Sequence, residues 1–202
     1  MASVSQAPAL GREISFESEN YLMRTLRPAD ATDRFSVWFE AEDVREMLNL
    51  PQQKRTKADM EAYIRSFDQR MSLLLGIFAK ADGLLVGIFS LYVDWAKRHF
   101  IANTIVGEPA YRHKGLMIEV TPPFRAYFFN TCGLKVMTAT ALAHNAPIRA
   151  YLEKTGWTLD RIVKGEIKPK AGGAPIDLCY YSLTADAWNQ WYAKHGGARR
   201  KV

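Results

Sequence analysis

The sequence predicts a single α+β domain, built on a mixed, mostly antiparallel twisted sheet that is flanked by helices. The length of 202 residues suits one domain and is ample for a complete core. Apolar residues make up 48% of the chain, an ordinary share for a globular protein. Strand-like and helix-like segments follow one another without an internal repeat, and no linker is long enough to divide the chain.

The first third of the chain predicts a strand followed by two helices. Residues 21–27 alternate between apolar and polar side chains and stop at Pro28, as a strand does. Asp30 can cap the next helix, whose apolar residues recur at helical spacing. A second helix with one apolar face is expected over residues 57–70.

The rest of the chain predicts a hairpin, a third strand, and then alternating helices and strands. The tight-turn pair Asp82-Gly83 lies between expected strands at 73–78 and 84–93, and a third strand is expected at 100–106. The elements expected after it are a helix from about residue 114, a strand at 136–141, a helix opening at Asn145, a mobile loop at 165–175, a strand at 176–183, and a helix capped by Thr184.

The two ends of the chain differ from the domain between them. We expect residues 1–20 to be a flexible extension, 21–192 to be the domain, and 193–202 to be a basic tail. The start lacks the pattern of a signal peptide and no apolar run reaches the ~18 residues of a membrane span, so the expected location is cytoplasmic, without a membrane partner.

Charge is unevenly distributed. Residues 1–70 carry 10 Lys+Arg and 12 Asp+Glu, whereas the remaining 132 carry 17 and 9. A basic half of this kind can attract nucleic acid, a membrane or a phosphorylated cofactor. Because a short basic tail is ordinarily solvated, we do not expect nucleic acid to be a partner.

Cysteine and histidine usage argues against a metal site. Cys132 and Cys179 are too few and too isolated for a disulfide framework or a metal centre. The four histidines show no ligand spacing either. We therefore expect two buried thiols and no metal.

A first motif joins the expected strand at 100–106 to the following helix. A helix N-terminus has unpaired N–H groups and the positive end of a dipole, which makes it a site for anions. Arg112, His113 and Lys114 add side-chain donors, and Gly115 lets a ligand approach the backbone closely. A pyrophosphate fits this pattern, and an ordinary turn with solvated cations fits equally well on this segment alone. The glycine spacing excludes a nucleotide P-loop and a dinucleotide fingerprint.

Two motifs together resemble one known family. Arg112-x-x-Gly115-x-Met117 resembles the acetyl-CoA motif of the Gcn5-related N-acetyltransferases (GNAT), whose pattern is Gln/Arg-x-x-Gly-x-Gly/Ala. Asn145-x5-Tyr151-x4-Gly156-Trp157 resembles the second signature of that family and follows in the right order and at the right distance. The segments 24–28 and 182–188 are most similar to the branch that acetylates the N-termini of ribosomal proteins.

The chain departs from the family pattern at two places. Met117 stands where the family has a small residue, so its side chain would crowd the pyrophosphate. Pro122 and Pro123 fall inside the helix that begins near Lys114, where a proline removes a backbone donor. We expect a kink or an early end of the helix there.

The resemblance implies direct transfer of an acetyl group from acetyl-CoA to a primary amine, without a covalent intermediate. It places Tyr151 as the acid that protonates the departing thiolate and Asn145 in contact with the cofactor arm. It places the pantetheine and the thioester on the backbone of Ile105 and Val106. The remaining cofactor contacts that it implies are those of Arg112, His113, Lys114, Gly115, Leu116 and Met117. Tyr151 can instead be a packing residue, and Asn145 can act as a helix N-cap as well.

The general base and the acceptor are less defined. Glu108 is expected to be exposed and Glu119 to pack or pair structurally. His99 and Asp94, near strand ends, and a water chain to a backbone carbonyl are the remaining candidates, and no base is assigned. The resemblance places the acceptor between the acidic stretch 40–46 and the loop 165–175. Trp38, Phe39 and Glu42 are the candidate acceptor residues, although the acidic side chains can equally form an ordinary solvated helix face.

Several functional hypotheses follow. The leading one is an N-acetyltransferase acting on a protein N-terminus or a small-molecule amine. The alternative is a catalytically degenerate module of the same fold that binds CoA as a sensor or partner. A third is an RNA- or ribosome-associated module. The sequence does not fix the oligomeric state, and a homodimer is compatible with it.

Overall fold

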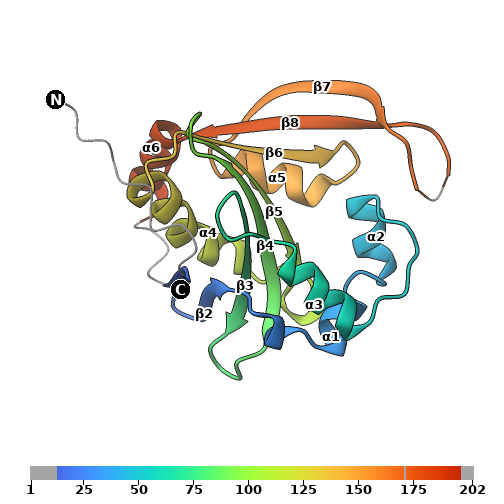
Figure 1. Ribbon diagram of the computed structural model, residues 1–202. Helices are drawn as coiled ribbons and strands as arrows, with labels where there is room; N and C mark the ends of the chain where they lie inside the picture. The colour runs from blue at the N-terminus through green and yellow to red at the C-terminus, as the bar shows by residue number, and fades with distance from the viewer. Residues whose placement is uncertain (1–12, 171, 197–202) are drawn as a thin grey trace.

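In a computed structural model of the chain, the described residues are 13–170 and 172–196. Within them, one sheet has the strand order β1-β2-β3-β4-β5-β6-β8-β7 (Figure 1). Neighbouring strands are antiparallel, except that β5 and β6 run parallel. The strands are β1 (Ser15–Glu17), β2 (Tyr21–Thr25), β3 (Ser72–Ala79), β4 (Leu85–Asp94), β5 (His99–Val106), β6 (Val136–Leu142), β7 (Thr158–Ile167) and β8 (Ile176–Thr184). The predicted α+β fold with a mixed, mostly antiparallel sheet is confirmed.

Helices cover both faces of this sheet (Figure 1). Three helices pack against one face of the sheet and contribute to the larger core. They are α4 (Leu116–Ala126), α5 (Ala146–Lys154) and α6 (Ala185–His195). The helices from the first third of the chain are α1 (Asp33–Val37), α2 (Glu42–Leu48) and α3 (Lys57–Arg65). Shorter turns complete the described elements: η1 (Pro28–Asp30), η2 (Pro109–Tyr111) and the π-helical η3 (Tyr127–Thr131).

Strand β3 shows how the sequence makes two cores. Successive side chains of a strand point to opposite faces, so a wholly apolar strand must be covered on both sides. Leu73, Leu75 and Ile77 belong to the core that includes α4, whereas Leu74 and Phe78 belong to the core that includes α1 and α3. The order of the sheet follows from the burial of both faces.

The two prolines do not end helix α4. The helix continues through Pro122 and Pro123 to Ala126 and passes directly into η3, so the expected early end is wrong. Proline removes the donor but not the apolar face. Val120 and Phe124 are both 0% exposed. Burial of this face stabilises the helix where the backbone hydrogen bonds are missing, and π-turns are one known way to absorb such an irregularity.

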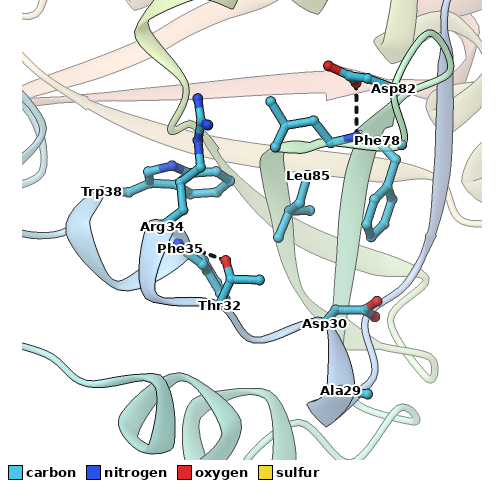
Figure 2. A pocket seen from close by; sticks show the side chains of 11 residues that line it. Ala29, Asp30, Thr32, Arg34, Phe35, Trp38, Phe78, Asp82 and Leu85 are labelled. Atoms are coloured by element: carbon cyan, nitrogen blue, oxygen red, sulfur yellow. Dashed lines mark hydrogen bonds between the residues drawn. The ribbon is translucent and has the colours of Figure 1, made fainter.

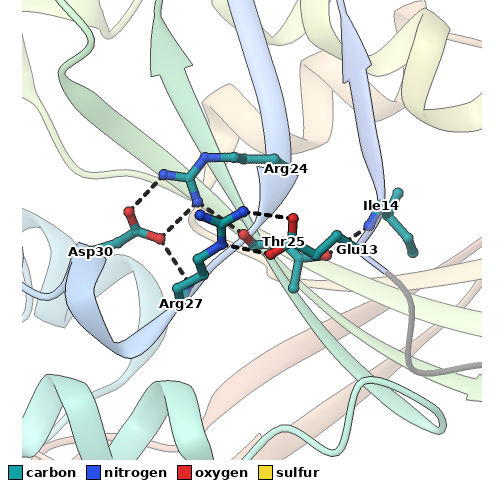
Figure 3. Close-up of polar contacts among 6 residues, drawn as sticks. All are labelled: Glu13, Ile14, Arg24, Thr25, Arg27 and Asp30. Carbon is teal, nitrogen blue, oxygen red and sulfur yellow. Dashed lines mark hydrogen bonds and ion pairs between the residues drawn. The ribbon is translucent and has the colours of Figure 1, made fainter.

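Asp30 does not cap α1, contrary to the prediction. Its carboxylate accepts two hydrogen bonds from the Arg24 guanidinium, at 2.7 and 2.6 Å, and one from the Arg27 backbone N–H (Figure 3). The N-cap is Thr32, whose hydroxyl accepts from the backbone N–H of Phe35 at 3.1 Å. A bidentate ion pair between Asp30 and Arg24 is stronger than a single capping hydrogen bond, and Thr32 is an adequate cap for α1.

Three segment boundaries differ from those expected. Strand β1 pairs with β2, so the sheet starts inside the segment 1–20 that was expected to be a flexible extension. Helix α3 ends at Arg65 instead of residue 70. The chain beyond it is held by Asp68, whose carboxylate accepts hydrogen bonds from the backbone N–H groups of Arg70, Met71 and Ser72. Strand β7 reaches Ile167, so the loop expected from residue 165 is shorter. Residues 1–12 and the expected basic residues 197–202 lie outside the described residues.

The first third of the chain forms three helices and not the two predicted, since α1 ends at Val37 and α2 begins separately at Glu42. The remaining boundary predictions hold closely. Thr184 caps α6 through the backbone N–H of Ala187, as predicted.

Cys132 and Cys179 are both buried and unpaired, also as predicted. No helix in the described ranges is long and apolar enough to cross a membrane.

Candidate active site

The two parallel strands of the sheet are paired only over a short stretch and then separate. Strands β5 and β6 pair only over His99–Ile101 and Val136–Thr138. Beyond this point β5 stays paired with β4 as far as Val106, and β6 stays paired with β8 as far as Leu142. Backbone N–H and C=O groups on the two facing edges therefore lack a strand partner, and they can hydrogen-bond an extended ligand that contains amides.

The turn before α4 has the form of an anion site. His113 and Gly115 have φ angles of 60° and 80°, both in the left-handed region. Such residues turn neighbouring backbone N–H groups toward a common point, which makes a concave site for anions. A Cβ placed on Gly115 would meet nothing within 4 Å, so the space in front of it is open. The donor set therefore fits a pyrophosphate.

The backbone, not the arginine side chain, carries this site. Arg112 donates to the carbonyl oxygens of Val106 and Gly107, both at 2.9 Å, and its guanidinium pairs with Asp43 of α2. It therefore ties the end of β5 to α2 and does not face the anion site. His113 and Lys114 are exposed and remain available to a phosphate.

Leu116 and Met117 contribute their first-turn N–H groups. Leu116 is 2% exposed and belongs to the larger core. Met117 is half-buried and packs against the same core. The Met117 side chain thus has an apolar place to lie, which lessens the crowding that the motif suggested.

The second motif opens α5 on the same side of the sheet. Asn145 is the N-cap of this helix, with its Oδ1 atom accepting from the backbone N–H of Ile148 at 3.4 Å. The amide nitrogen of Asn145 is left as a donor. Tyr151 lies farther along α5 and is half-buried.

The hydroxyl of Tyr151 is already engaged with α4. It donates to Thr121 Oγ1 at 2.9 Å and accepts from the Arg125 guanidinium at 3.2 Å. Thr121 donates in turn to the carbonyl oxygen of Met117 at 2.6 Å. The structure thus links the two motifs through one chain of hydrogen bonds.

Side chains at α1 hold the turn that ends β5 through contacts with Glu108 and Gly107. Glu108 is 3% exposed, contrary to the expectation that it would be exposed. Its carboxylate accepts a bidentate pair from Arg34 and a hydrogen bond of 3.0 Å from Trp38 Nε1. The indole also lies directly on Gly107, where a Cβ would come within 1.7 Å of Trp38 Cδ2.

None of the four base candidates is unpartnered. Hydrogen bonds from Arg34 hold the pKa of Glu108 below its ordinary value, against the opposing effect of burial. Hydrogen bonds from the backbone and side chain of Lys97 likewise lower the pKa of Asp94. A lowered pKa makes a carboxylate a weaker base.

The other two candidates also have partners. His99 Nε2 lies 2.8 Å from Thr138 Oγ1, where β5 and β6 are paired. Glu119 accepts from the Ser18 hydroxyl and from the backbone and side chain of Asn20, which ties α4 to the turn between β1 and β2. The predicted structural role of Glu119 is confirmed.

The two segments expected to flank the acceptor meet in the structure. Asn49, at the end of α2, donates to the carbonyl oxygen of Lys168 at 3.0 Å and accepts from the Lys170 N–H at 2.8 Å. Within the acidic stretch, Asp43 forms an ion pair with Arg112, and Glu40 accepts a hydrogen bond from the backbone N–H of Arg55.

The candidate acceptor residues lie at different depths. Phe39 is 8% exposed and belongs to the core between α1 and α3. Glu42, at the first turn of α2, is exposed. Trp38 is 4% exposed and lines a cavity of about 470 Å³ between α1 and the β3–β4 hairpin (Figure 2). This cavity also includes Arg34, Phe35, Phe78, Asp82 and Leu85.

Sequence patterns did not indicate Arg34, Thr121 or Arg125. Arg34 lies one helical turn before Trp38. This spacing indicates that Arg34 can reach Glu108 only once Trp38 is known to contact Glu108. Arg125 lies between Phe124 and Phe128, and an arginine on a helix is ordinarily expected to be exposed to solvent. The described residues contain no group of three or more His, Cys, Asp or Glu side chains that could hold a metal ion.

The splayed strands and the anion-binding turn define a protein that can hold an extended, phosphorylated ligand. The model of the GNAT acetyltransferase domain matches residues 20–158. The chain therefore belongs to the GNAT acetyltransferase family, whose acetyl donor is acetyl-CoA. The family inferred from the two motifs is confirmed, and with it the nature of the co-substrate.

Solved structures agree on the fold. A GCN5-related N-acetyltransferase from Brucella melitensis is 18% identical, with a TM-score of 0.74 over 93% of this chain and 84% of that one. Ribosomal-protein-S5-alanine acetyltransferase from Vibrio fischeri is 16% identical, with a TM-score of 0.73 over 87% and 98%. Spermidine N-acetyltransferase from Vibrio cholerae, solved with CoA and spermine, is 13% identical, with a TM-score of 0.74 over 84% and 98%. No curated protein sequence matches the chain. At these identities the likeness concerns the fold and not the acceptor.

Proposed function

We propose that this protein transfers the acetyl group of acetyl-CoA directly to a primary amine, either a protein N-terminus or a small-molecule amine. The observation that carries the proposal is the separation of β5 from β6, which leaves the end of β5 unpaired on that side just before the positive-φ turn at the start of α4. An extended ligand with phosphates at one end and amides along its length matches both parts.

The proposed cofactor contacts follow the geometry. Backbone N–H groups from His113 to Met117 would hold the pyrophosphate, with Lys114 adding a cation. Unpaired backbone groups near Ile105 and Val106 would hold the pantetheine arm and polarise the thioester carbonyl. The amide nitrogen of Asn145 would donate to the same arm.

The proposed chemistry needs a proton acceptor and a proton donor. The amine must lose a proton before it attacks, because an ammonium has no lone pair. Tyr151 would give a proton to the thiolate that leaves. With the candidate carboxylates in ion pairs, the amine proton would leave through water, and we assign no side chain as the base.

The acceptor would enter beside α2 and the loop that follows β7. Asn49 joins the end of α2 to this loop by two hydrogen bonds and so holds the two segments side by side. Glu42 and Trp38 would be the nearest candidates to contact it. The ribosomal-protein and spermidine acetyltransferases of similar fold make protein N-termini and polyamines the first acceptors to test.

A second proposal is a CoA-binding module without turnover. The observation in its favour is that the Tyr151 hydroxyl is bonded to Thr121 and Arg125, while Glu108, Asp94 and Glu119 all have partners. Such a protein would bind acetyl-CoA and acetylate nothing.

An acceptor screen distinguishes the two proposals. Purified protein is incubated with acetyl-CoA and a panel of N-terminal peptides and polyamines, and released CoA thiol is measured, with Tyr151→Phe as the matched variant. Turnover that falls at least tenfold in the variant, with acetyl-CoA binding unchanged, supports the acid role. Binding of acetyl-CoA without turnover on any amine would favour the sensor.

A further inference from the structure

Arg125 is a buried cation without a carboxylate partner. Its side chain is 1% exposed, and no ion pair involves it among the described residues. Its Nε atom has no hydrogen-bond partner within the described part of the chain. Burying a guanidinium without an anion is costly, so a folded protein that keeps one gains something from it.

Aromatic rings and two oxygen atoms surround this guanidinium. Its Cζ atom lies 5.1 Å from the ring centre of Trp188, 5.5 Å from that of Trp157 and 5.9 Å from that of Tyr151. One terminal nitrogen donates to the Tyr151 hydroxyl at 3.2 Å, and the other reaches the Thr155 carbonyl oxygen at 3.5 Å. The shorter of the two hydrogen bonds therefore goes to the candidate acid.

The hydrogen bonds of this cluster can run in one direction only. An arginine can only donate, and a backbone carbonyl can only accept. Arg125 therefore donates to Tyr151, Tyr151 donates to Thr121, and Thr121 donates to the carbonyl oxygen of Met117. The phenol oxygen receives a charge-assisted hydrogen bond, while its proton points toward α4.

This direction has a chemical consequence. A hydrogen bond from a cation to the phenol oxygen stabilises the ionised phenol more than the neutral one, and the low dielectric of a buried site strengthens the effect. A merely structural arginine would link α4, α5 and α6 equally well through its ring contacts. The two roles differ in whether Arg125 changes the acidity of Tyr151.

We propose that Arg125 is a positioning residue that holds the phenol oxygen of Tyr151 and stabilises the negative charge left there when Tyr151 protonates the departing thiolate. The O–H bond of Tyr151 breaks, the phenol oxygen keeps the electron pair, and an S–H bond forms on CoA. The phenolate then regains a proton from the acceptor amine, which loses one on acetylation. This inference rests on the proposed function and on the acid role of Tyr151 within it.

The test combines kinetics with an NMR measurement on the protein without acetyl-CoA. Arg125→Met keeps the length and apolar contacts of the side chain but removes every donor, and Arg125→Lys keeps the charge. Each is made in the wild-type background and in Tyr151→Phe, and circular dichroism confirms folding. In protein labelled with 13C at tyrosine Cζ, the Tyr151 resonance is assigned by its loss in Tyr151→Phe.

The expected kinetic result is a strong dependence on background. Arg125→Met lowers kcat roughly tenfold or more when Tyr151 is present and less than about twofold in Tyr151→Phe, with KM for acetyl-CoA nearly unchanged. Arg125→Lys recovers part of the loss. The Tyr151 resonance shifts in Arg125→Met relative to the wild type, because the phenol oxygen has lost its charged donor.

Two results would overturn the idea, and they are distinguishable. An equal loss of kcat in both backgrounds, with the Tyr151 resonance unmoved, makes Arg125 a structural residue and leaves acetyl transfer intact. If the wild type acetylates no amine, the proposed function fails, and the role of Arg125 in it fails too. If Arg125→Met does not fold, the same comparison is made with Arg125→Lys, which must still lose activity only when Tyr151 is present.

Discussion

The contact between Gly107 and Trp38 makes a sharp prediction for Gly107→Ala. The new Cβ would lie 1.7 Å from Cδ2 and 2.1 Å from Cε3 of the indole. The ring cannot move aside freely, since it is 4% exposed, packs edge-on against Phe35 at 5.0 Å and donates to Glu108 at 3.0 Å. The substitution must therefore shift either the indole or the turn that ends β5.

The expected cost follows from these contacts. Overpacking a tight site costs about 1–3 kcal/mol, and losing a hydrogen bond to a charged group costs about 1.5–3 kcal/mol. The sum of about 2.5–6 kcal/mol corresponds to a fall in Tm of roughly 5–20 °C for a chain of this length. Because the shifted turn borders the proposed thioester position, the affinity for acetyl-CoA should also fall.

Urea and thermal unfolding measure this effect, with Gly83→Ala as the matched control. Gly83 has a φ of +71° and open space around its would-be Cβ, so alanine there meets only the backbone strain of about 1–2 kcal/mol. Gly107→Ala should be clearly less stable than this control. A Gly107→Ala protein that unfolds within about 1 kcal/mol of the wild type would refute the inferred packing of Trp38 on the turn.

Three further predictions concern the rest of the domain. Thr184→Ala removes the cap of α6 and should cost about 1 kcal/mol in urea unfolding; a cost near zero would show that the cap is dispensable. Backbone hydrogen bonds from Ser72 and Arg70 lower the pKa of Asp68 from an ordinary 3.8 to about 2. Its stabilisation is therefore complete above pH 3.8 and is lost as pH falls toward 2, so the stability gap between wild type and Asp68→Ala should close over that range in acid titrations. A gap that is independent of pH would contradict this. Burial raises the pKa of Cys132 to about 11, so this thiol should resist alkylation in the native protein at pH 8, and rapid labelling would contradict its burial.

The sequence predicted most of the sheet because its strands have strong local signals. The Asp82-Gly83 turn fixes the hairpin of β3 and β4, and the apolar alternation of β5 leads directly into the first motif. Strand β7 was not separately defined, because most of its residues are exposed and a sheet edge imposes little pattern on its sequence. Strand β1 is three residues long, which is too short for any period to show.

Local sequence signals identify the backbone features of the candidate site better than the partners of its side chains. The glycine at position 115 and the cap at Asn145 can be found by spacing, because each meets a backbone requirement. The partners of Arg112, Glu108 and Tyr151 lie 69, 74 and 30 positions away in the chain, at Asp43, Arg34 and Thr121. Nothing local encodes such contacts, since they depend on which helices the sheet brings together.

The most direct test of the proposed acetyl-CoA site is a calorimetric titration of the protein with acetyl-CoA, with dephospho-CoA as the control ligand. Binding in the micromolar range with a stoichiometry of one is the predicted result. If saturating acetyl-CoA produces no heat and no rise in Tm, then the turn from Arg112 to Met117 does not form an anion site, and the proposed acetyl transfer is wrong.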